Sequence, residues 1–444
     1  MSKDQTIFAL ASAPGRGGVA VFRISGPDAR KGVTSLCKPN DVPKAREVTL
    51  RKIHHPKTGE LIDRALVLFF EAPNSFTGED VVEFHLHGGR AIANAMSECL
   101  RSISNFRMAE PGEFSRRAFE NNKMDLTEAE AIADLVNAET DAQRRQALRQ
   151  MEGALGQLYE NWRARLIKSL AYLEAAIDFS DEDLPQETLN KQTSELGNLA
   201  QEISQHLDDG HRGERLRDGF SIAILGKPNA GKSSLLNALA RRDAAIVSST
   251  AGTTRDVIET HLDLGGYPVT LADTAGLRES ADAIENEGIR RALKRAEQAD
   301  LKLLVFDGAV WPQRDAETSK LMDQNAIAIV NKSDLTKTRL PEDDHEYLFV
   351  SAKTGDGIHT LLDRLLKEID VRFAETGQPP LTRARHREAL EEAVQHLTRS
   401  LTAEGAELRA EDVRLSMRAL GRITGRVDVE DLLDVIFRDF CIGK

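Results

Sequence analysis

The stretch Phe220-Ser-Ile-Ala-Ile-Leu-Gly-Lys-Pro-Asn-Ala-Gly-Lys-Ser-Ser-Leu-Leu-Asn-Ala-Leu239 decides the fold of the central part of the chain. Its first six residues predict a buried strand, and its last six predict the start of a helix. Between them, Gly226-Lys-Pro-Asn-Ala-Gly-Lys-Ser233 has the spacing of a phosphate-binding loop. In such a loop, backbone N–H groups surround the phosphates, Lys232 meets the outer phosphates, and the Ser233 hydroxyl can bind Mg²⁺. The predicted nucleotide contacts here are Asn229, Ala230, Gly231, Lys232, Ser233 and Ser234.

Two downstream segments predict which base is bound. Asn331-Lys-Ser-Asp334 follows the apolar run 326–330, so it lies at a strand end. The Asp334 carboxylate can accept two hydrogen bonds from guanine, whereas adenine has no matching donors, a mismatch worth roughly 10⁴-fold or more. Ser351-Ala-Lys353 follows a second apolar run and would add contacts to the base. The predicted base contacts are Asn331, Lys332, Ser333, Asp334, Ser351, Ala352 and Lys353.

Two further segments are predicted to sense the third phosphate. Asp273-Thr-Ala-Gly276 follows the run 269–272, which directs Asp273 toward the Mg²⁺ ligands and the Gly276 N–H toward the γ-phosphate. Thr274 and Ala275 complete this motif. A hydroxyl in Gly252-Thr-Thr-Arg-Asp256, assigned to Thr254, would complete the Mg²⁺ coordination. The order of the motifs is that of a GTPase and excludes a protein kinase.

One position departs from Ras-like enzymes, because Leu277 stands where those proteins have a glutamine that orients water. Asn229 and the loop 248–252 suggest a K⁺ site built from oxygen ligands. A K⁺ ion there would act as an arginine finger does, a role worth about 10³ to 10⁵ in rate. In the alternative interpretation, Asn229 only shapes the loop. The candidate loop residues are Ser248, Ser249, Thr250, Ala251, Gly252 and Thr253.

Composition limits the classes of protein that fit. The 444 residues are enough for two or three domains. No apolar stretch approaches 18 residues, and the polar start Met1–Ile7 does not resemble a signal peptide, so we expect neither a membrane span nor export. Three cysteines without a metal-like cluster suit a reducing cytoplasm. A net charge of -12 argues against a continuous nucleic-acid-binding surface.

The pattern along the chain predicts a multidomain α/β plus α-helical protein. Residues 1–120 alternate short apolar runs with turns and predict an α/β domain. Apolar residues at three- and four-residue steps from Leu148 to Ile177 predict one long amphipathic helix, and Thr127–Glu130 resembles a capping box. We expect a Ras-like GTPase domain at 216–377 inserted between two parts of one helical domain, 121–215 and 378–444. A nucleotide switch placed there could move the helices that carry it.

Five further segments resemble those of one family. They are Phe440-Cys-Ile-Gly-Lys444, Pro14-Gly-Arg-Gly-Gly18, Phe22-Arg-Ile-Ser-Gly26, Pro73-Asn-Ser-Phe-Thr-Gly-Glu79 and His87-Gly-Gly89. With the nucleotide motifs, they resemble the MnmE (TrmE) family of tRNA uridine-modification GTPases over essentially the whole chain. Other GTPases share the nucleotide motifs but not this N-terminal region or the C-terminal C-I-G-K.

The resemblance implies a GTP hydrolase that forms a homodimer through its N-terminal domain and acts in the cytoplasm. It implies a flavoprotein partner that carries FAD, MnmG (GidA), in a heterotetramer or larger complex with no membrane. With this partner the family adds an aminomethyl or carboxymethylaminomethyl group to C5 of the wobble uridine, position 34, of certain tRNAs. The implied one-carbon donor is 5,10-methylenetetrahydrofolate, with 5-formyltetrahydrofolate as an analogue, bound by a tetrahydrofolate-binding-like domain.

The resemblance also implies roles for single residues. Arg23, Glu83, Lys123 and Lys444 match the folate contacts; without the resemblance, each would be read as part of a structural ion pair. Asn229, Ser248, Thr250 and Thr253 match a K⁺ site, and Ser233 and Thr254 match a Mg²⁺ site. The implied catalytic residues are Glu285, in place of the absent glutamine, with Lys232, Thr254, Gly276 and Cys441. Cys441 has a second interpretation, as a small apolar residue of the tail.

A competing hypothesis is a ribosome-assembly or other RNA-associated regulatory GTPase, which would use the same switch without one-carbon chemistry. Such a factor usually carries a basic RNA-binding domain. This chain instead ends in an amphipathic helix followed by C-I-G-K. The two ends of the chain therefore favour the tRNA-modification hypothesis.

Overall fold

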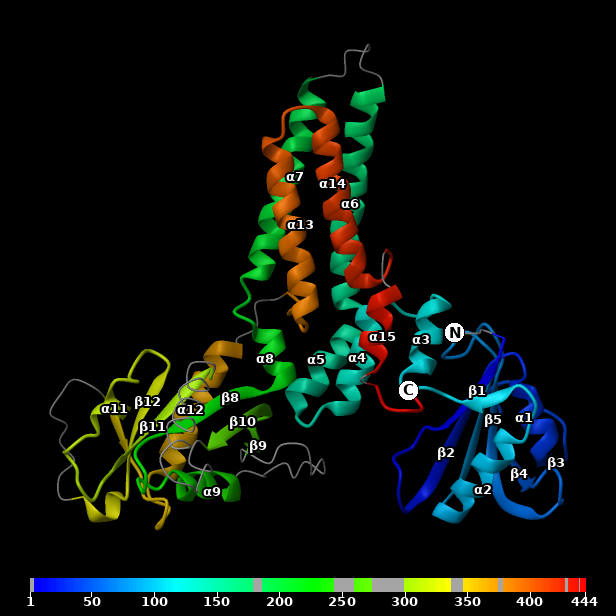
Figure 1. The fold of residues 1–444 in the computed structure, drawn as a ribbon, viewed down its shortest axis with the longest axis horizontal. Coiled ribbons are helices and arrows are strands. Elements are labelled where there is room, and N and C mark those ends of the chain that lie inside the picture. Colours follow the sequence, from blue (N-terminus) through cyan, green and yellow to red (C-terminus); the bar gives the residue numbers. More distant parts are fainter. Residues whose placement is uncertain are drawn as a thin grey trace, which may run out of the picture. The chain divides into compact units, whose positions relative to one another are not determined.

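The computed structural model describes residues 4–178, 186–242, 259–273, 299–336, 346–373, 378–427, 430–438 and 440–444. The chain divides into two units (Figure 1). Unit 1 contains residues 1–133, 151–168 and 417–444, and unit 2 contains residues 134–150 and 169–416. The predicted fold class, α/β domains combined with a helical region, is confirmed. The boundaries of the four predicted segments stay a prediction.

Unit 1 is built on a seven-stranded sheet in the order β3-β4-β5-β6-β2-β1-β7. Helices α1 and α2 cover one face of the sheet, where Val33 and Leu36 of α1 and Met96 and Leu100 of α2 are buried. The strands are β1 (Thr6–Leu10), β2 (Gly17–Ser25), β3 (Cys37–Lys38), β4 (Thr49–His54), β5 (Leu61–Phe70), β6 (Val81–Gly88) and β7 (Phe106–Met108), and the helices are α1 (Ala29–Leu36) and α2 (Arg90–Arg101).

The second face of this sheet is covered only in part. Ile7 and Ala9 of β1 pack there against Phe114 and, at the edge, Phe76. Toward the other edge, Leu50 of β4 is directly paired with Leu66 of β5. Their side chains are exposed, at 65% and 42%. These two leucines are open within unit 1, beside the exposed pair Lys52 and Arg64 on the same face.

Helices from both ends of the chain pack together in unit 1. Leu433, Phe437 and Phe440 pack against Leu126 and Ala129, which confirms the predicted apolar face near the C-terminus. The helices concerned are α3 (Glu113–Glu120), α4 (Leu126–Asn137) and α15 (Glu430–Arg438), with parts of α6 (Ala154–Asp178) and α14 (Ala406–Thr424).

The predicted capping box was placed two residues too late. Asp125 Oδ1 accepts a hydrogen bond from the Glu128 N–H at 2.9 Å, and Glu128 Oε2 accepts one from the Asp125 N–H at 2.8 Å. This reciprocal pair caps α4 as a capping box does, with aspartate in place of serine or threonine.

The single long helix predicted from Leu148 to Ile177 is also wrong. The structure forms two helices, α5 (Asp141–Met151) and α6, with a break at Gly153. Gly153 has a φ of +85°, in the left-handed region that ends a helix and that residues with a Cβ rarely adopt. The apolar stripe itself is confirmed in α6, where Trp162 and Leu166 are buried.

Unit 2 contains a six-stranded sheet in the order β13-β12-β11-β8-β10-β9. All neighbours are parallel except β9 and β10, which are antiparallel. Residues of α9 and α12, among them Leu235, Leu239 and Leu361, pack against β8 and its neighbours. The strands are β8 (Phe220–Leu225), β9 (Glu259–Leu264), β10 (Tyr267–Asp273), β11 (Leu301–Asp307), β12 (Ala326–Asn331) and β13 (Tyr347–Phe349), with helices α9 (Lys232–Arg242), α11 (Ala316–Ser319), η1 (Ser333–Leu335) and α12 (Ile358–Phe373).

The chain enters and leaves the GTPase region through one junction in unit 2. Arg387 donates hydrogen bonds to Asp209 Oδ1, at 2.7 Å, and to the Leu207 carbonyl, at 2.8 Å. Arg383 donates to Asp134 Oδ1 at 2.7 Å. The helices at this junction are α7 (Gln186–Leu207), α8 (Arg212–Asp218) and α13 (Ala384–Thr402). Segments before and after the GTPase region are therefore held together. Within the described ranges, every helix is too short or too polar to cross a membrane.

Candidate functional site

The predicted phosphate loop joins β8 to α9. Lys232 is buried, and its Nζ atom donates hydrogen bonds to the carbonyl oxygens of Gly226, at 2.8 Å, and Lys227, at 3.1 Å. A Cβ atom at Gly226 would lie 2.3 Å from the Val305 carbonyl oxygen, so a side chain does not fit where the chain leaves β8. The loop therefore curls back at the N-terminus of α9, where N–H groups and the helix dipole favour an anion.

Asn331 connects this loop to the segment predicted to contact the base. Its side chain is 1% exposed. Nδ2 donates a hydrogen bond to the Ala230 carbonyl at 2.9 Å, and Oδ1 accepts one from the Ala352 N–H at 3.1 Å. The amide thus uses both its donor and its acceptor to hold the two loops at a fixed distance. The sequence placed Asn331 in the site but did not predict this role.

Lys332 and Ser351 orient the neighbouring groups. Lys332 Nζ donates to the Asn229 carbonyl and to Asp307 Oδ2, both at 2.7 Å. The Ser351 hydroxyl donates to Asp334 Oδ1 at 2.7 Å. Asp334 Oδ2 has no hydrogen-bond partner among the described residues, so a carboxylate oxygen is presented at the predicted place for guanine.

The other predicted nucleotide contacts are only partly described. Ser233, Ser234 and Lys353 are exposed around the loop, and Ser333 lies in η1. Asp273 ends β10 opposite Ile224, beside the phosphate loop. Its side chain lies outside the described residues, as do Ser248, Ser249, Thr250, Ala251, Gly252, Thr253, Thr254, Thr274, Ala275, Gly276 and Glu285. Of the predicted metal ligands, the structure describes Asn229 and Ser233.

Replacement of Asp334 by asparagine should shift base preference from guanine toward xanthine nucleotides. The amide turns one acceptor into a donor, while the Ser351 hydroxyl can still bond the remaining oxygen. We expect at least about a hundredfold loss of GTP affinity with a gain for xanthosine triphosphate. Fluorescence titration with both nucleotides measures this, with Asp363→Asn on the exposed face of α12 as the matched control. Loss of GTP binding without any gain for xanthosine triphosphate would contradict the assigned role of Asp334.

Unit 1 holds a second group of predicted site residues. Arg23 on β2 is directly paired with Glu83 on β6, and Arg23 Nε donates to Glu83 Oε1 at 2.9 Å. The second carboxylate oxygen lies 3.2 Å from His85 Nε2. The Arg23 guanidinium lies over the rings of Phe76, at 5.5 Å, and Phe114, at 5.8 Å. Aromatic rings therefore enclose an ion pair on the partly open sheet face, and His85, Phe76 and Phe114 join the residues that sequence reasoning had assigned.

A hydrogen-bond network fixes the loop that carries Phe76. The Ser25 hydroxyl lies 2.6 Å from both Thr77 Oγ1 and Glu79 Oε2. Arg117 Nη1 donates to the two carboxylate oxygens of Glu79, at 3.2 and 3.1 Å. The segment Pro73–Glu79, recognised in the sequence only as part of a resemblance, is thus tied to β2 and α3.

Glu113 is a buried carboxylate of the same hydrogen-bond network. The carboxylate of Glu113 is buried, and it accepts hydrogen bonds from Arg107 and Arg117. Burial alone would raise the pKa of Glu113, but the bonds from Arg107 and the Glu110 N–H outweigh it and hold the pKa below its usual value. Removal of one partner of a buried ion pair costs about 3–5 kcal/mol, so the network is a rigid support for the loop.

The C-terminal tail reaches the same place. The Phe114 N–H donates to the main-chain oxygen of Lys444 at 3.2 Å, and Ile442 forms a β-bridge with Pro111. A Cβ atom at Gly443 would lie 2.6 Å from the Leu10 carbonyl oxygen, so this contact requires glycine. The tail and Arg23 therefore meet at Phe114.

The cysteines differ in their surroundings. Cys441 in the tail is exposed, whereas Cys37 and Cys99 are buried. Burial raises the pKa of the Cys37 thiol to about 12, so this thiol is unreactive at neutral pH. Among the described residues, no cluster of His, Cys, Asp or Glu side chains could hold a metal ion.

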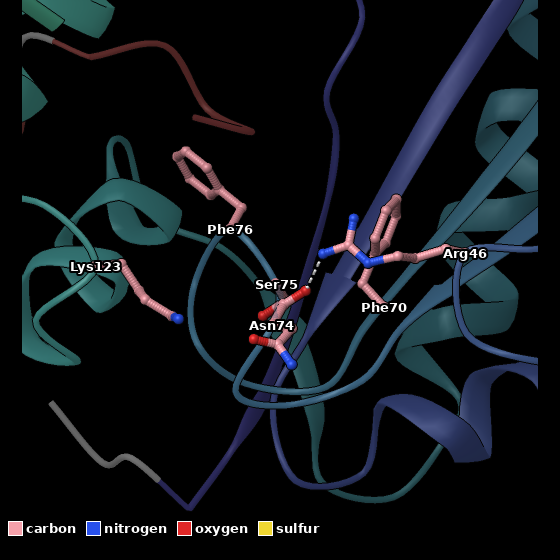
Figure 2. Close-up of a pocket in the computed structure, with 6 residues that line it drawn as sticks. All are labelled: Arg46, Phe70, Asn74, Ser75, Phe76 and Lys123. Carbon is pink, nitrogen blue, oxygen red and sulfur yellow. Dashed lines mark hydrogen bonds between the residues drawn. The ribbon is translucent and has the colours of Figure 1, made fainter. Parts of the chain in front are cut away.

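A pocket of about 470 Å³ adjoins Phe76 in unit 1 (Figure 2). It is lined by Arg46, Phe70, Asn74, Ser75, Phe76 and Lys123. Of these, only Lys123 was assigned from the sequence. The pocket combines two aromatic side chains with two cations, which suits a flat ligand that carries negative charge.

Comparison with known proteins places both units in one family. Residues 6–123 match the family described as the GTP-binding protein TrmE N-terminus, and residues 126–441 match the MnmE helical domain. A protein of Paramagnetospirillum magneticum named tRNA modification GTPase MnmE is 56% identical over 99% of this chain and 100% of its own length. Proteins of the same name from Parvibaculum lavamentivorans and Rickettsia akari are 55% and 49% identical, each over 99% of this chain and 100% of their own length.

Among solved structures, the G domain of the T. maritima FeoB iron transporter is 27% identical over 35% of this chain and 98% of its own length, with a TM-score of 0.24. The similarity to the MnmE proteins, by contrast, covers nearly the whole chain and therefore both units. The chain therefore belongs to the MnmE family of tRNA modification GTPases.

Proposed function

We propose that this protein is the K⁺-dependent GTPase subunit of a complex that modifies C5 of the wobble uridine, position 34, of certain tRNAs. It would add an aminomethyl or carboxymethylaminomethyl group with a tetrahydrofolate one-carbon donor. The observation that carries the proposal is the second site in unit 1, where the tail and Arg23, which is bonded to Glu83, meet at Phe114. A GTPase that acted only as a switch would not need such a site.

In unit 2, the residues have roles that follow from their positions. Lys232 would neutralise the outer phosphates, and the hydroxyl of Ser233 would bind Mg²⁺, with Thr254 and Asp273 completing its surroundings. The Gly276 N–H would bind the γ-phosphate, and Glu285 would orient the attacking water in place of glutamine. The bond from Lys332 to the Asn229 carbonyl supports a fixed loop on which Asn229 can offer its side-chain oxygen to K⁺.

In unit 1, the folate would bind against the open sheet face. The Glu83 carboxylate can accept hydrogen bonds from the donor edge of a pterin, while the bond from Arg23 holds that carboxylate in place. The Phe76 ring would border the ligand, and Lys123 would face its acidic tail. Cys441 and Lys444 would close the site from the C-terminal tail. When bound, the folate supplies the one-carbon unit, and these residues orient it and shield it from water.

The assembly we propose is a homodimer that joins a flavoprotein partner of the MnmG type, which contributes FAD. The exposed pair Leu50 and Leu66 supports the dimer, because contiguous apolar side chains on a sheet face mark contact surfaces. The complex would act in the cytoplasm on tRNA. GTP hydrolysis would change how the GTPase domains associate and so open or close the folate site.

Reconstitution tests this function directly. Purified protein is combined with the flavoprotein, methylenetetrahydrofolate, GTP, K⁺, tRNA and either an ammonium salt or glycine as the nitrogen donor, and the wobble nucleoside is analysed by mass spectrometry. The modified uridine should form only in the complete mixture and should disappear when folate or GTP is omitted. Formation without folate would contradict the one-carbon role, and absence of any modified uridine with all components present would contradict the function.

A further inference from the structure

Arg46 is held rigidly at the mouth of the pocket in unit 1. Its N–H donates to the Phe69 carbonyl at 2.8 Å, and its Nη2 donates to the Asn74 carbonyl at 2.7 Å (Figure 2). Its guanidinium lies 5.8 Å from the centroid of the Phe70 ring. A carbonyl and a ring fix the cation but leave its charge unneutralised, so Arg46 is prepared to bind an anion.

Lys123 provides the second charge of this pocket. Its side chain lies on the opposite side of the pocket from Arg46 (Figure 2) and is exposed. Among the described residues, no carboxylate forms an ion pair with Arg46 or Lys123, and the pocket lining contains no acid. Two cations without acidic partners across an open pocket are suited to a ligand with more than one negative charge.

The pocket is next to the proposed pterin site. Phe76 lines the pocket and also lies 5.5 Å from the Arg23 guanidinium. On the sheet face, Phe70 is paired with Val81, and Val81 lies two residues from Glu83 on β6. Two residues along a strand span about 7 Å. A ligand with one end at Glu83 can therefore pass Phe76 and place its other end between Arg46 and Lys123.

We propose that Arg46 and Lys123 bind the carboxylates of the glutamate tail of the folate, and that this protein prefers folates with several γ-linked glutamates. The inference rests on the proposed folate site. It adds the orientation of the bound folate, with the pterin at Glu83 and the glutamate tail in the pocket. Each added glutamate brings one more carboxylate within reach of the two cations. The benzoyl ring between pterin and tail would pass beside Phe76.

A nucleic-acid phosphate has the same charge but fits the surroundings less well. Glu47 and Glu71 follow Arg46 and Phe70 directly in the chain, and both are exposed. A backbone of many phosphates needs a continuous basic surface, and these acids interrupt it. A short acidic tail needs only the pocket itself.

Calorimetric titration with 5-formyltetrahydrofolate, as the monoglutamate and as the pentaglutamate, tests the proposal. The unmodified protein should bind the pentaglutamate about five- to twentyfold more tightly, since each exposed ion pair contributes up to about fivefold. The doubly substituted Arg46→Gln/Lys123→Gln protein should bind the two forms equally. The preference of the unmodified protein should also decrease as salt is raised.

The control is Lys44→Gln, which removes one positive charge close to Arg46 in the chain but outside the pocket and should keep the preference. Equal melting temperatures of the variants will show that folding is intact. Equal binding of both folates by the unmodified protein, or equal effects of the control and the pocket variants, would overturn the inference while leaving the folate site in place. Absence of any folate binding would overturn both proposals, and loss of tRNA binding without loss of the glutamate preference would assign the cations to nucleic acid.

Discussion

GTP hydrolysis should be on the order of 10² to 10³ times faster in KCl than in NaCl at equal ionic strength. The reason is that a monovalent cation between the phosphates replaces the charge of an arginine finger. The site needs oxygen ligands spaced for the larger ion, and the smaller Na⁺ can make short bonds to only some of them. Initial phosphate release in KCl, NaCl and choline chloride measures the effect.

The phosphate loop is stiff where the cation would bind. Asn229 has a φ of +66°, and Lys332 Nζ, itself paired with Asp307, holds its carbonyl at 2.7 Å. The loop therefore cannot contract around Na⁺ without breaking these contacts. Asn229→Gly keeps this backbone conformation and removes the side-chain oxygen, so it should abolish the K⁺ stimulation while leaving GTP affinity within a few fold. Equal rates in the two salts would refute the cation site, and full K⁺ stimulation of the glycine variant would leave Asn229 as a residue that only shapes the loop.

The sequence predicted the parts of the fold that local patterns encode. The run Phe220–Leu225 forms β8 with the same bounds, and Ala326–Val330 forms nearly all of β12, because both strands are buried on two faces and read as continuous apolar runs. The phosphate loop and the base segments follow these strands and so lie at one edge of the sheet. The approximate positions of these loops follow from the order of the strands in the sheet, and that order can be inferred from the spacing of the motifs.

The contacts that complete the sites depend on tertiary structure. The sequence could not show that Asn331 bonds both Ala230 and Ala352, since these residues are far apart in the chain. The missed residue Arg46 bonds Asn74 across 28 positions. The break at Gly153 was missed for a different reason: the apolar period continues through it, and periodicity carries no information about a φ of +85°.

The Arg23–Glu83 pair can be a structural ion pair and part of a ligand site at the same time. The two side chains are bonded as a structural pair would be, and they are 21% and 16% exposed. At this burial the pair loses solvation, which the attraction between the two charges only partly offsets. Here the pair lies between the rings of Phe76 and Phe114, beside a pocket and the tail, so its cost in desolvation is better explained by a ligand that shares the carboxylate.

Removal of residues 441–444 should abolish uridine modification, at least about a thousandfold, while K⁺-stimulated GTP hydrolysis stays within about twofold. The tail contributes Cys441 and Lys444 to the proposed folate site, and its main chain bonds Phe114 and Pro111. The described residues of the nucleotide site make no bond to it. The test measures two quantities on the truncated protein: the rate of phosphate release and the amount of modified wobble uridine.

Two further variants separate the possible roles of the tail. Cys441→Ser keeps every main-chain contact, so loss of modification in this variant would assign chemistry to the thiol, and retention would make the tail a positioning segment. Gly443→Ala keeps the thiol but brings a Cβ atom to 2.6 Å from the Leu10 carbonyl, which should displace the tail and reduce both modification and folate affinity. Full modification by the truncated protein would remove the tail from the active site. Loss of both activities would show instead that the tail stabilises the fold. The packing contacts of Ile442 and Gly443 in unit 1 would then be the role of the tail.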